Sequence, residues 1–166
     1  HIISQVVHLV SRVSKQLGVS PTRIGFATPG VLNPATQTMK NCNTTSMNGK
    51  PMAADLAKAL GVEVRLANDA NCFALAETLL GVVQEVNPKA EVVFGIIMGT
   101  GVGGGLVVHG QVINGLHGIG GEWGHNILEE GGKSCYCGKS GCVEHVISGP
   151  ALEEYYFASS GQKLRM

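Results

Sequence analysis

One histidine and three cysteines lie close together in the last third of the sequence, at a spacing that suits a metal ion. The cysteines follow the pattern C-x-C-x4-C, and the four residues are His125, Cys135, Cys137 and Cys142. Imidazole nitrogen and thiolate sulfur are preferred zinc ligands, and four of them complete a tetrahedral shell with no open position. The spacing predicts a structural zinc site, with three buried free thiols beside an unrelated histidine as the alternative.

Two glutamates flank these residues. Glu122 shortly precedes His125, and Glu144 shortly follows Cys142, so a metal ion that gathers the four ligands draws both carboxylates toward one region. Carboxylates accept hydrogen bonds from hydroxyls, and the second ring nitrogen of His125 could donate one. These groups favour a polyol as the bound molecule, whereas solvated surface charge is the alternative interpretation.

A glycine-rich segment, Gly99-Thr-Gly-Val-Gly-Gly104, matches the dinucleotide pattern G-x-G-x-x-G. That pattern needs a helix after the turn, whereas residues 106–113 have the alternation of a β-hairpin. We therefore expect a strand, a turn and a second strand. Its small residues would let a phosphate approach the backbone N–H groups and the Thr100 hydroxyl. A plain tight turn is the alternative.

Asn68 and Asp69 stand where a predicted strand ends and a predicted helix begins. The positive end of the helix dipole favours a negative charge there, which suits a carboxylate that accepts a proton from a hydroxyl. Asp and Asn are also the commonest residues that cap a helix. From the residues alone, capping is the simpler interpretation and a catalytic base is the alternative.

Helical and extended patterns alternate along the first half of the chain. We expect a helix over 3–17, a strand over 22–27, a long loop or irregular hairpin over 31–50, a helix over 51–60, a strand over 62–67 and a helix over 70–80. The apolar face of the last helix is predicted to use Phe73, Ala74, Ala76, Leu79 and Leu80. The alternation indicates an α/β protein with a parallel or mixed sheet.

The pattern becomes richer in strands and glycine after Asn87-Pro88. A strand over 92–97 and a hairpin of 106–108 with 111–113 are expected, followed much later by a helix from about Pro150. A lobe boundary is placed between Asn68 and Pro88, which gives two domains, 1–68 and 69–166.

Composition narrows the possible functions. The 12 basic and 12 acidic residues balance, and no Lys/Arg cluster is present, so direct nucleic-acid binding is not expected. The cysteine spacing does not suggest a disulfide framework, which favours a reducing cytoplasm. The apolar runs are short, and neither a leader nor a membrane span is predicted.

Four motifs together resemble the ROK family, which joins fructokinases, glucokinases and N-acetylhexosamine kinases to sugar-responsive repressors. They are Asn68-Asp-Ala-Asn71, Gly99-Thr-Gly-Val-Gly-Gly-Gly105, Gly121-Glu-Trp-Gly-His125 and Cys135-Tyr-Cys-Gly-Lys-Ser-Gly-Cys-Val-Glu144. The resemblance implies the two-lobed actin/hexokinase-like (ribonuclease H-like) ATPase fold. It also implies ATP with Mg²⁺, a hexose of the fructose, mannose or glucose class, structural Zn²⁺ and a homo-oligomer such as a dimer.

The same resemblance assigns roles to individual residues. Asp69 matches the base that takes the proton from the sugar hydroxyl as it attacks the γ-phosphate. The zinc ligands are His125, Cys135, Cys137 and Cys142. The sugar contacts implied are Gly30, Asn43, Asn68, Asp69, Glu122, His125 and Glu144, and the phosphate contacts are Gly99, Thr100, Gly101, Gly103 and Gly104. The segment from Glu122 to Asn126 is closer to the fructokinases and mannokinases than to the N-acetyl sugar kinases.

One motif of the family's kinases does not occur in this sequence. They carry an Asp-x-Gly-Gly phosphate loop, whereas the aspartates here, Asp55 and Asp69, are not followed by that pattern. We therefore expect the chain to be the central part of a sugar kinase, inactive as a fragment. The alternative is the effector-binding part of a sugar-responsive repressor, and a zinc-stabilised binding module without catalysis is a third possibility.

Overall fold

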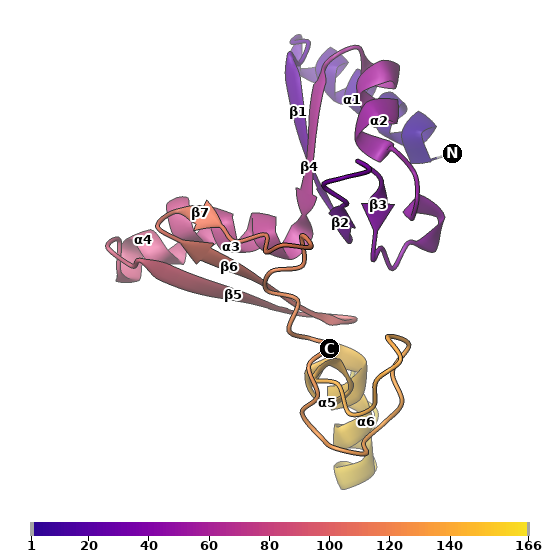
Figure 1. Cartoon of the computed structure of the whole chain (residues 1–166), viewed down its shortest axis with the longest axis vertical. Helices are drawn as coiled ribbons and strands as arrows, with labels where there is room; N and C mark the ends of the chain where they lie inside the picture. The colour runs from indigo at the N-terminus through magenta and orange to yellow at the C-terminus, as the bar shows by residue number, and fades with distance from the viewer. Residues whose placement is uncertain (1, 166) are drawn as a thin grey trace. The chain divides into compact units, whose positions relative to one another are not determined.

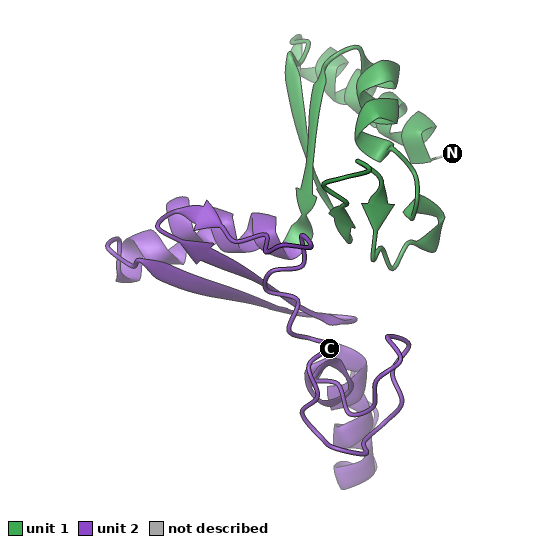
Figure 2. Cartoon of the chain, in the orientation of Figure 1, with its two compact units in different colours: residues 1–69 green, residues 70–166 purple. Residues whose placement is uncertain are grey.

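The structure, a computed structural model, describes residues 2–165 and divides after Asp69 into two compact units. Figure 1 labels the elements and Figure 2 colours the two units. His1 and Met166 lie outside the described residues. Within 2–165, no helix is both long and apolar enough to cross a membrane.

Unit 1 contains a parallel strand pair covered by two helices. Strands β1 (Arg23–Thr28) and β4 (Glu63–Asn68) pair in parallel, with Thr28 opposite Asn68 at their carboxyl ends. Helices α1 (Ile2–Leu17) and α2 (Met52–Leu60) pack against each other, and α2 packs on β4 (Figure 1). Gly61 ends α2 with a left-handed φ of 69°, as a glycine after a helix commonly does. The predicted parallel α/β arrangement is confirmed for these elements.

The predicted irregular hairpin is also present. Strands β2 (Val31–Leu32) and β3 (Met39–Lys40) pair antiparallel and are followed by a short 3₁₀ helix, η1 (Thr45–Met47). Apolar side chains of this segment enter the core of unit 1, which consists of Met39, Cys42, Met47, Met52 and Leu56. The hairpin is therefore anchored by burial of its own side chains.

Unit 2 is built on an antiparallel sheet in the order β5-β6-β7. Its strands are β5 (Val92–Met98), β6 (Val102–Val108) and β7 (Gln111–Val112). Helix α3 (Asp69–Leu79) follows β4 directly, and the short α4 (Val82–Val86) comes next. After a long irregular segment, α5 (Glu144–Ile147) and α6 (Gly149–Ser160) complete the unit. Ser148 caps α6, because its Oγ accepts a hydrogen bond from the Ala151 N–H.

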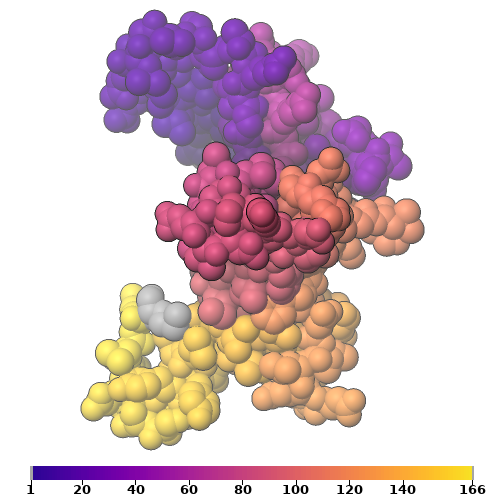
Figure 3. Space-filling view, turned by 90° about the vertical axis from the view of Figure 1, so that its left-hand side faces the viewer, coloured from indigo at the N-terminus to yellow at the C-terminus, as the bar shows by residue number. Residues whose placement is uncertain are grey.

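The packing of α3 on this sheet corrects the predicted apolar face. Ala74, one of the five residues expected on the apolar face, is buried. Leu79 and Leu80, two others, are 49% and 87% exposed. The segment around α4 that follows them lies on the face shown in Figure 3. The buried residues of α3 are Ala70, Asn71, Ala74 and Thr78. Small residues replace large ones here because the strands opposite are glycine-rich.

Gly95 and Gly105 provide the space for this close approach. They are partners in the β5–β6 register. A Cβ on Gly105 would lie 2.6 Å from the Ala70 carbonyl oxygen and 2.9 Å from the Ala74 Cβ, and one on Gly95 would lie 2.8 Å from that same Cβ. The glycines therefore let the helix backbone sit directly on the sheet, a packing that periodicity of large apolar residues does not reveal.

Gly105→Ala is expected to destabilise the protein by about 1–3 kcal/mol, because the new methyl group meets backbone that cannot move without shifting α3. Urea unfolding of the whole protein measures this loss. Gly25→Ala is the matched control, since a Cβ at Gly25 in β1 meets nothing within 4 Å. Equal stability of the two variants would contradict the proposed packing.

The glycine turn is shorter than predicted. Met98 pairs with Val102, and Gly103 and Gly104 already belong to β6. The turn itself consists of Gly99, Thr100 and Gly101, closed by a hydrogen bond from the Gly99 N–H to the Gly101 carbonyl oxygen at 2.9 Å. The predicted strand–turn–strand is confirmed, with the turn limited to three residues.

Candidate metal centre and adjoining polar site

The four predicted metal ligands come together in unit 2. Their ligand atoms all lie within 4.8 Å of one another. His125 Nδ1 is 3.5 Å from Cys135 Sγ, and Cys137 Sγ is 3.6 Å from Cys142 Sγ. A tetrahedral zinc with ordinary bond lengths separates two sulfurs by roughly 3.8 Å and a sulfur from a nitrogen by roughly 3.5 Å. The residues therefore fit a zinc ion with little movement.

Tight turns around the cysteines produce this convergence. The Cys135 N–H donates to the Lys139 carbonyl oxygen, and the Gly138 N–H donates back to Cys135. Gly138 and Gly141 have φ values of 88° and 74°, which glycine adopts at little cost. Gly141 also has no room for a Cβ, because the Glu129 carbonyl oxygen occupies that position. The glycines between the cysteines thus shape the loop as well as space its ligands.

The thiols of the cluster differ in their tendency to ionise. Burial raises the pKa of Cys142 to about 12, and its contacts with the neighbouring cysteines add to the rise. The pKa of Cys137 is lowered, chiefly because its sulfur accepts a hydrogen bond from the Lys139 backbone N–H. Zinc binds thiolates, so a bound ion would supply the positive charge that the buried Cys142 thiolate lacks.

Tyr136 is a residue of the site that the sequence analysis missed. Its hydroxyl lies 2.9 Å from His125 Nε2, and the two rings meet edge to face with centroids 5.0 Å apart. The ring nitrogen of His125 that faces away from the cysteines thus contacts a hydroxyl of the chain itself. The interleaved position in Cys-Tyr-Cys was the available signal, because a residue between two ligands must lie beside the metal site.

Glu122 and Glu144 lie near this tyrosine. Burial raises the pKa of Tyr136, and the negative charges of Glu144, Cys135, Cys137 and Glu122 raise it further. Both carboxylates predicted to flank the metal ligands therefore do so in space. The cluster, the two carboxylates and the His125–Tyr136 pair form one polar site in unit 2.

Trp123 holds the segment that carries Glu122 and His125 against the sheet. Its indole N–H donates to the Gly103 carbonyl oxygen at 3.0 Å, and its ring meets Phe94 edge to face at 5.8 Å. A Cβ on Gly104 would lie 2.7 Å from the Trp123 ring. Trp123 is therefore a packing residue, and it covers part of the glycine segment predicted to bind phosphate.

The Glu144 carboxylate contacts the glycine turn. Its Oε2 accepts a hydrogen bond from the Val102 N–H at 3.0 Å, and a Cβ on Gly101 would lie 2.6 Å from that oxygen. The Gly149 N–H at the start of α6 donates to the Gly99 carbonyl oxygen at 2.7 Å. The turn is thus hydrogen-bonded on both sides by the segment that follows Cys142.

A second group of predicted site residues gathers at the carboxyl ends of the strands in unit 1. Asn68 ends β4 and is 8% exposed, and its Nδ2 donates to the Gly30 carbonyl oxygen at 3.3 Å. Gly30 has a φ of 71° and no room for a Cβ, which would lie 2.7 Å from Cys42 Sγ. Asp69 follows directly as the exposed first residue of α3.

Asn48 fixes the loop that carries Asn43. Its side-chain oxygen accepts from the Cys42 N–H at 2.9 Å, and its amide nitrogen donates to the Cys42 carbonyl oxygen at 3.1 Å. The Cys42 thiol also donates to the Pro29 carbonyl oxygen at 3.1 Å. Asn43 is the next residue and is exposed. The structure therefore joins Gly30, Asn43 and Asn68 through one hydrogen-bonded loop, in which Asn48 was not predicted.

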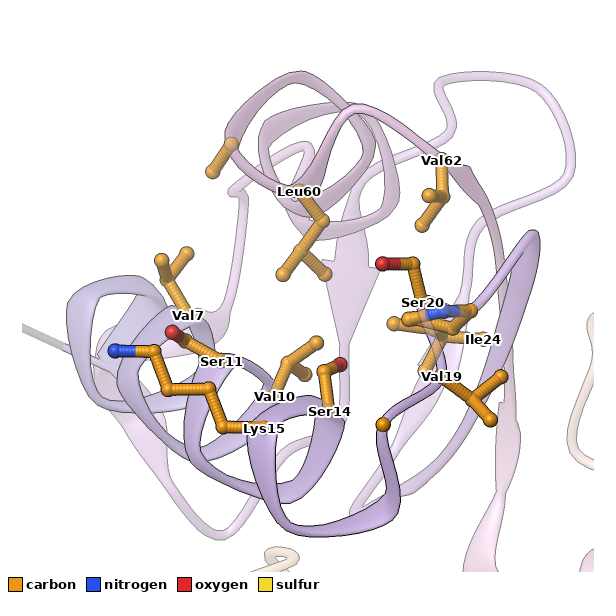
Figure 4. A pocket seen from close by; sticks show the side chains of 13 residues that line it. Val7, Val10, Ser11, Ser14, Lys15, Val19, Ser20, Ile24, Leu60 and Val62 are labelled. Carbon is orange, nitrogen blue, oxygen red and sulfur yellow. The ribbon is translucent and has the colours of Figure 1, made fainter.

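A hollow of unit 1 lies apart from these residues. It has a volume of about 450 Å³ and is lined mainly by residues of α1, α2 and the loop before β1. Val10 of α1 and Leu60 of α2 point toward it in Figure 4. None of the predicted site residues lines this hollow.

Comparison with known proteins identifies the family. The ROK family model matches residues 1–165. An N-acetyl-D-glucosamine kinase of Pectobacterium carotovorum subsp. carotovorum (strain PC1) is 35% identical, and the alignment covers 98% of the chain and 55% of that protein. The chain belongs to the ROK family, and it spans about half the length of the curated relatives it matches.

Solved structures agree with this assignment. The ROK hexokinase from Thermus thermophilus has 34% identity and a TM-score of 0.78, covering 99% of this chain and 53% of that one. A ROK family transcriptional regulator, a homologue of the E. coli MLC protein, has 28% identity and a TM-score of 0.74, covering 95% and 40%. The fold is the actin/hexokinase-like α/β fold expected from the motifs.

Proposed function

We propose that this chain is the central part of an ATP-dependent hexose kinase. The single observation that carries the proposal is Asp69, which stands at the junction of β4 and α3 beside Asn68, itself hydrogen-bonded to Gly30. In this proposal, the two units are the end of the first lobe and the start of the second. The whole protein works in the cytoplasm on a hexose and ATP, and a homodimer is the proposed assembly.

Asp69 acts as the general base of the proposed reaction. As the sugar hydroxyl attacks the γ-phosphorus of ATP, the carboxylate accepts the hydroxyl proton and ADP leaves. The N-terminus of α3 stabilises the negative charge that Asp69 brings to the reaction. Asp69 is exposed to solvent.

Hydroxyl contacts to the sugar are proposed for residues of each unit separately. Gly30, Asn43 and Asn68 contribute from unit 1, whose hydrogen-bonded loop orders them. Glu122 and His125 contribute from unit 2, where a sugar hydroxyl takes the place of the Tyr136 hydroxyl beside His125 Nε2. A contact from Glu144 is a further prediction, alongside the hydrogen bond that its Oε2 accepts from Val102.

The glycine turn is the proposed phosphate contact. The turn contains Gly99, Thr100 and Gly101, so its backbone carries a single side chain, which ends in a small hydroxyl group. Such a turn lets phosphate oxygens approach closely, while Gly103 and Gly104 shape the strand behind it. Phosphoryl transfer asks a protein mainly for positioning and charge neutralisation, and Mg²⁺ bound with ATP supplies part of that charge.

Zinc is the proposed structural cofactor. His125, Cys135, Cys137 and Cys142 would hold it, and its role there is to fix the loop, since four protein ligands leave no position for substrate. The Cys142 side chain is fully buried, so the ion would secure the segment from which Glu144 extends.

Release of ADP by the whole protein, measured over a panel of sugars, tests the proposal. The panel contains N-acetylglucosamine, glucose, mannose and fructose, because the curated relatives are named N-acetyl-D-glucosamine kinases whereas the Glu122–Asn126 segment favours fructose or mannose. Sugar-dependent ADP release with at least one member supports the kinase. Absence of ADP release with every member would contradict it.

A repressor is the second candidate, favoured by the likeness to a ROK family transcriptional regulator. In that case the same polar residues bind a sugar as an effector, and Asp69 only caps α3. Sugar binding measured by calorimetry, without ADP release, would favour this alternative over the kinase. The unit-1 loop and the metal cluster serve both functions, so they do not separate them.

A further inference from the structure

We propose that Glu144 is a positioning residue that couples the metal cluster to the glycine turn, so that zinc occupancy sets the conformation of the turn. The consequence for the nucleotide rests on the proposed function, whereas the coupling itself does not. The residues concerned are Cys142, Glu144 and Val102, and all of them lie within unit 2.

The first step in the argument is the contact between carboxylate and turn. Val102 is opposite Met98 at the end of the hairpin, and its N–H donates to Glu144 Oε2 at 3.0 Å. Val102 itself is 6% exposed. Hydrogen bonds to a charged acceptor in a buried place are among the stronger ones in proteins. The carboxylate therefore holds the turn at the residue where β6 begins.

The second step is the fit between the turn and the carboxylate. A Cβ on Gly101 would lie 2.6 Å from Glu144 Oε2, and a Cβ on Gly124 would collide with the Val102 carbonyl oxygen. Glycine at both positions lets the carboxylate and the 121–125 segment close on Val102 from two sides. Positions 101 and 124 thus serve this contact, in addition to any close approach of a phosphate.

The third step connects Glu144 to the metal ligands. The backbone of Cys142 forms an antiparallel β-bridge with that of Ile127. The Val143 N–H donates to the Asn126 carbonyl oxygen at 3.0 Å, and the Glu144 N–H donates to the Gly124 carbonyl oxygen at 2.9 Å. His125 lies between Gly124 and Asn126. The backbone on both sides of His125 is therefore hydrogen-bonded to the backbone that follows Cys142. We call this pair of segments the joint, and the Glu144 side chain extends from it to the turn.

A metal ion would draw His125 and Cys142 together and hold this joint. Without the ion, only these backbone hydrogen bonds would hold the two segments together. Because the loop contains few helices or strands, the segments could then separate locally. The Glu144 carboxylate would then no longer be held against Val102. Zinc thus acts on the turn through Glu144.

Hydrogen–deuterium exchange of the peptide covering residues 98–104 tests the coupling in the whole protein. Glu144→Ala, with zinc bound, is expected to raise exchange at the Val102 amide about tenfold or more. Glu144→Gln keeps an acceptor oxygen and should raise it less. Glu130→Ala, an exposed glutamate in the same irregular segment, is the matched control and should leave exchange unchanged.

Removal of zinc from the wild type by a chelator should raise exchange in the same peptide, and removal from Glu144→Ala should add little, because both changes break one connection. Additive effects, or unchanged exchange in either case, would overturn the proposal. Zinc content of each variant is measured alongside. Loss of zinc from Glu144→Ala would also overturn it, since the residue would then act on the metal site.

Kinetics give an independent readout. If Glu144 positions the phosphate turn, Glu144→Ala raises the KM for ATP about tenfold. The KM for the sugar should rise as well, because Glu144 is also a proposed sugar contact. A rise confined to the sugar KM would contradict the positioning role and identify a sugar contact. If the whole protein phosphorylates no sugar, the proposed function fails, and the exchange experiment still decides the coupling.

Discussion

Replacing Asp69 by asparagine is expected to lower kcat for hexose phosphorylation about a thousandfold, because a general base typically contributes factors of about 10² to 10⁴. Asparagine caps a helix as well as aspartate does, so the start of α3 and the stability of the protein should be preserved. The KM for the sugar should change only a few fold, since the amide retains a hydrogen-bonding oxygen. Steady-state kinetics with the preferred sugar measure both values.

Asp55→Asn is the matched control, because Asp55 is the other aspartate of the chain and lies in the first turn of α2. It should keep the wild-type kcat. If Asp69→Asn also kept kcat within about threefold, Asp69 would be a helix-capping residue, and the proposed mechanism would lose its base.

Cys142→Ser is expected to abolish zinc binding and to cause the largest loss of stability among the substitutions considered. Structural zinc sites contribute on the order of 10 kcal/mol, which is comparable with the whole stability of a domain. Cys142 is fully buried. The serine hydroxyl would therefore replace a zinc-binding thiolate at a position that solvent water does not reach. We expect the melting temperature to fall by about 10 °C or more.

Metal analysis and thermal unfolding of the purified whole protein measure these effects. Cys72→Ser provides the comparison, because Cys72 lies in α3, outside the cluster, and its replacement should leave the zinc content unchanged. A Cys142→Ser protein that retained one zinc per chain and its melting temperature would show that the four residues are not a metal site.

The convergence of His125 and the three cysteines could be predicted from the sequence because the four residues are close along the chain, whereas zinc binding stays a prediction. The spacing of His125 and the three cysteines limits the ways in which one loop can place them, and the structure brings all four within 4.8 Å. The same holds for α1 and for the β5–β6 hairpin, where periodicity and turn residues act locally. Asp69 was likewise found from its place between a strand and a helix, although its role stays a prediction.

Contacts between segments far apart in the sequence could not be predicted. The predicted buried face of α3 was wrong because Ala70 and Ala74 pack on Gly95 and Gly105. This fit depends on the residues of the helix and of the sheet together. The hydrogen bond between Glu144 and Val102 spans 42 positions. No local pattern marks either contact, since each arises from how two elements meet.

Polar residues in loops were also only partly recovered. Asn43 was selected for its motif, but Asn48, which fixes the loop through both bonds to Cys42, looks like any other asparagine in a polar segment. Tyr136 was passed over because its neighbours are cysteines with an evident role. The function of a residue in such a segment depends on its hydrogen bonds, and the course of the backbone determines which hydrogen bonds can form.

Direct detection of a hexose phosphate by mass spectrometry tests the central claim most closely, because it separates transfer to the sugar from simple hydrolysis of ATP. The whole protein is incubated with ATP and each sugar of the panel, alongside the Asp69→Asn variant. The account predicts a phosphorylated sugar from the wild type and almost none from the variant. ADP without a sugar phosphate, or equal product from both proteins, would contradict it.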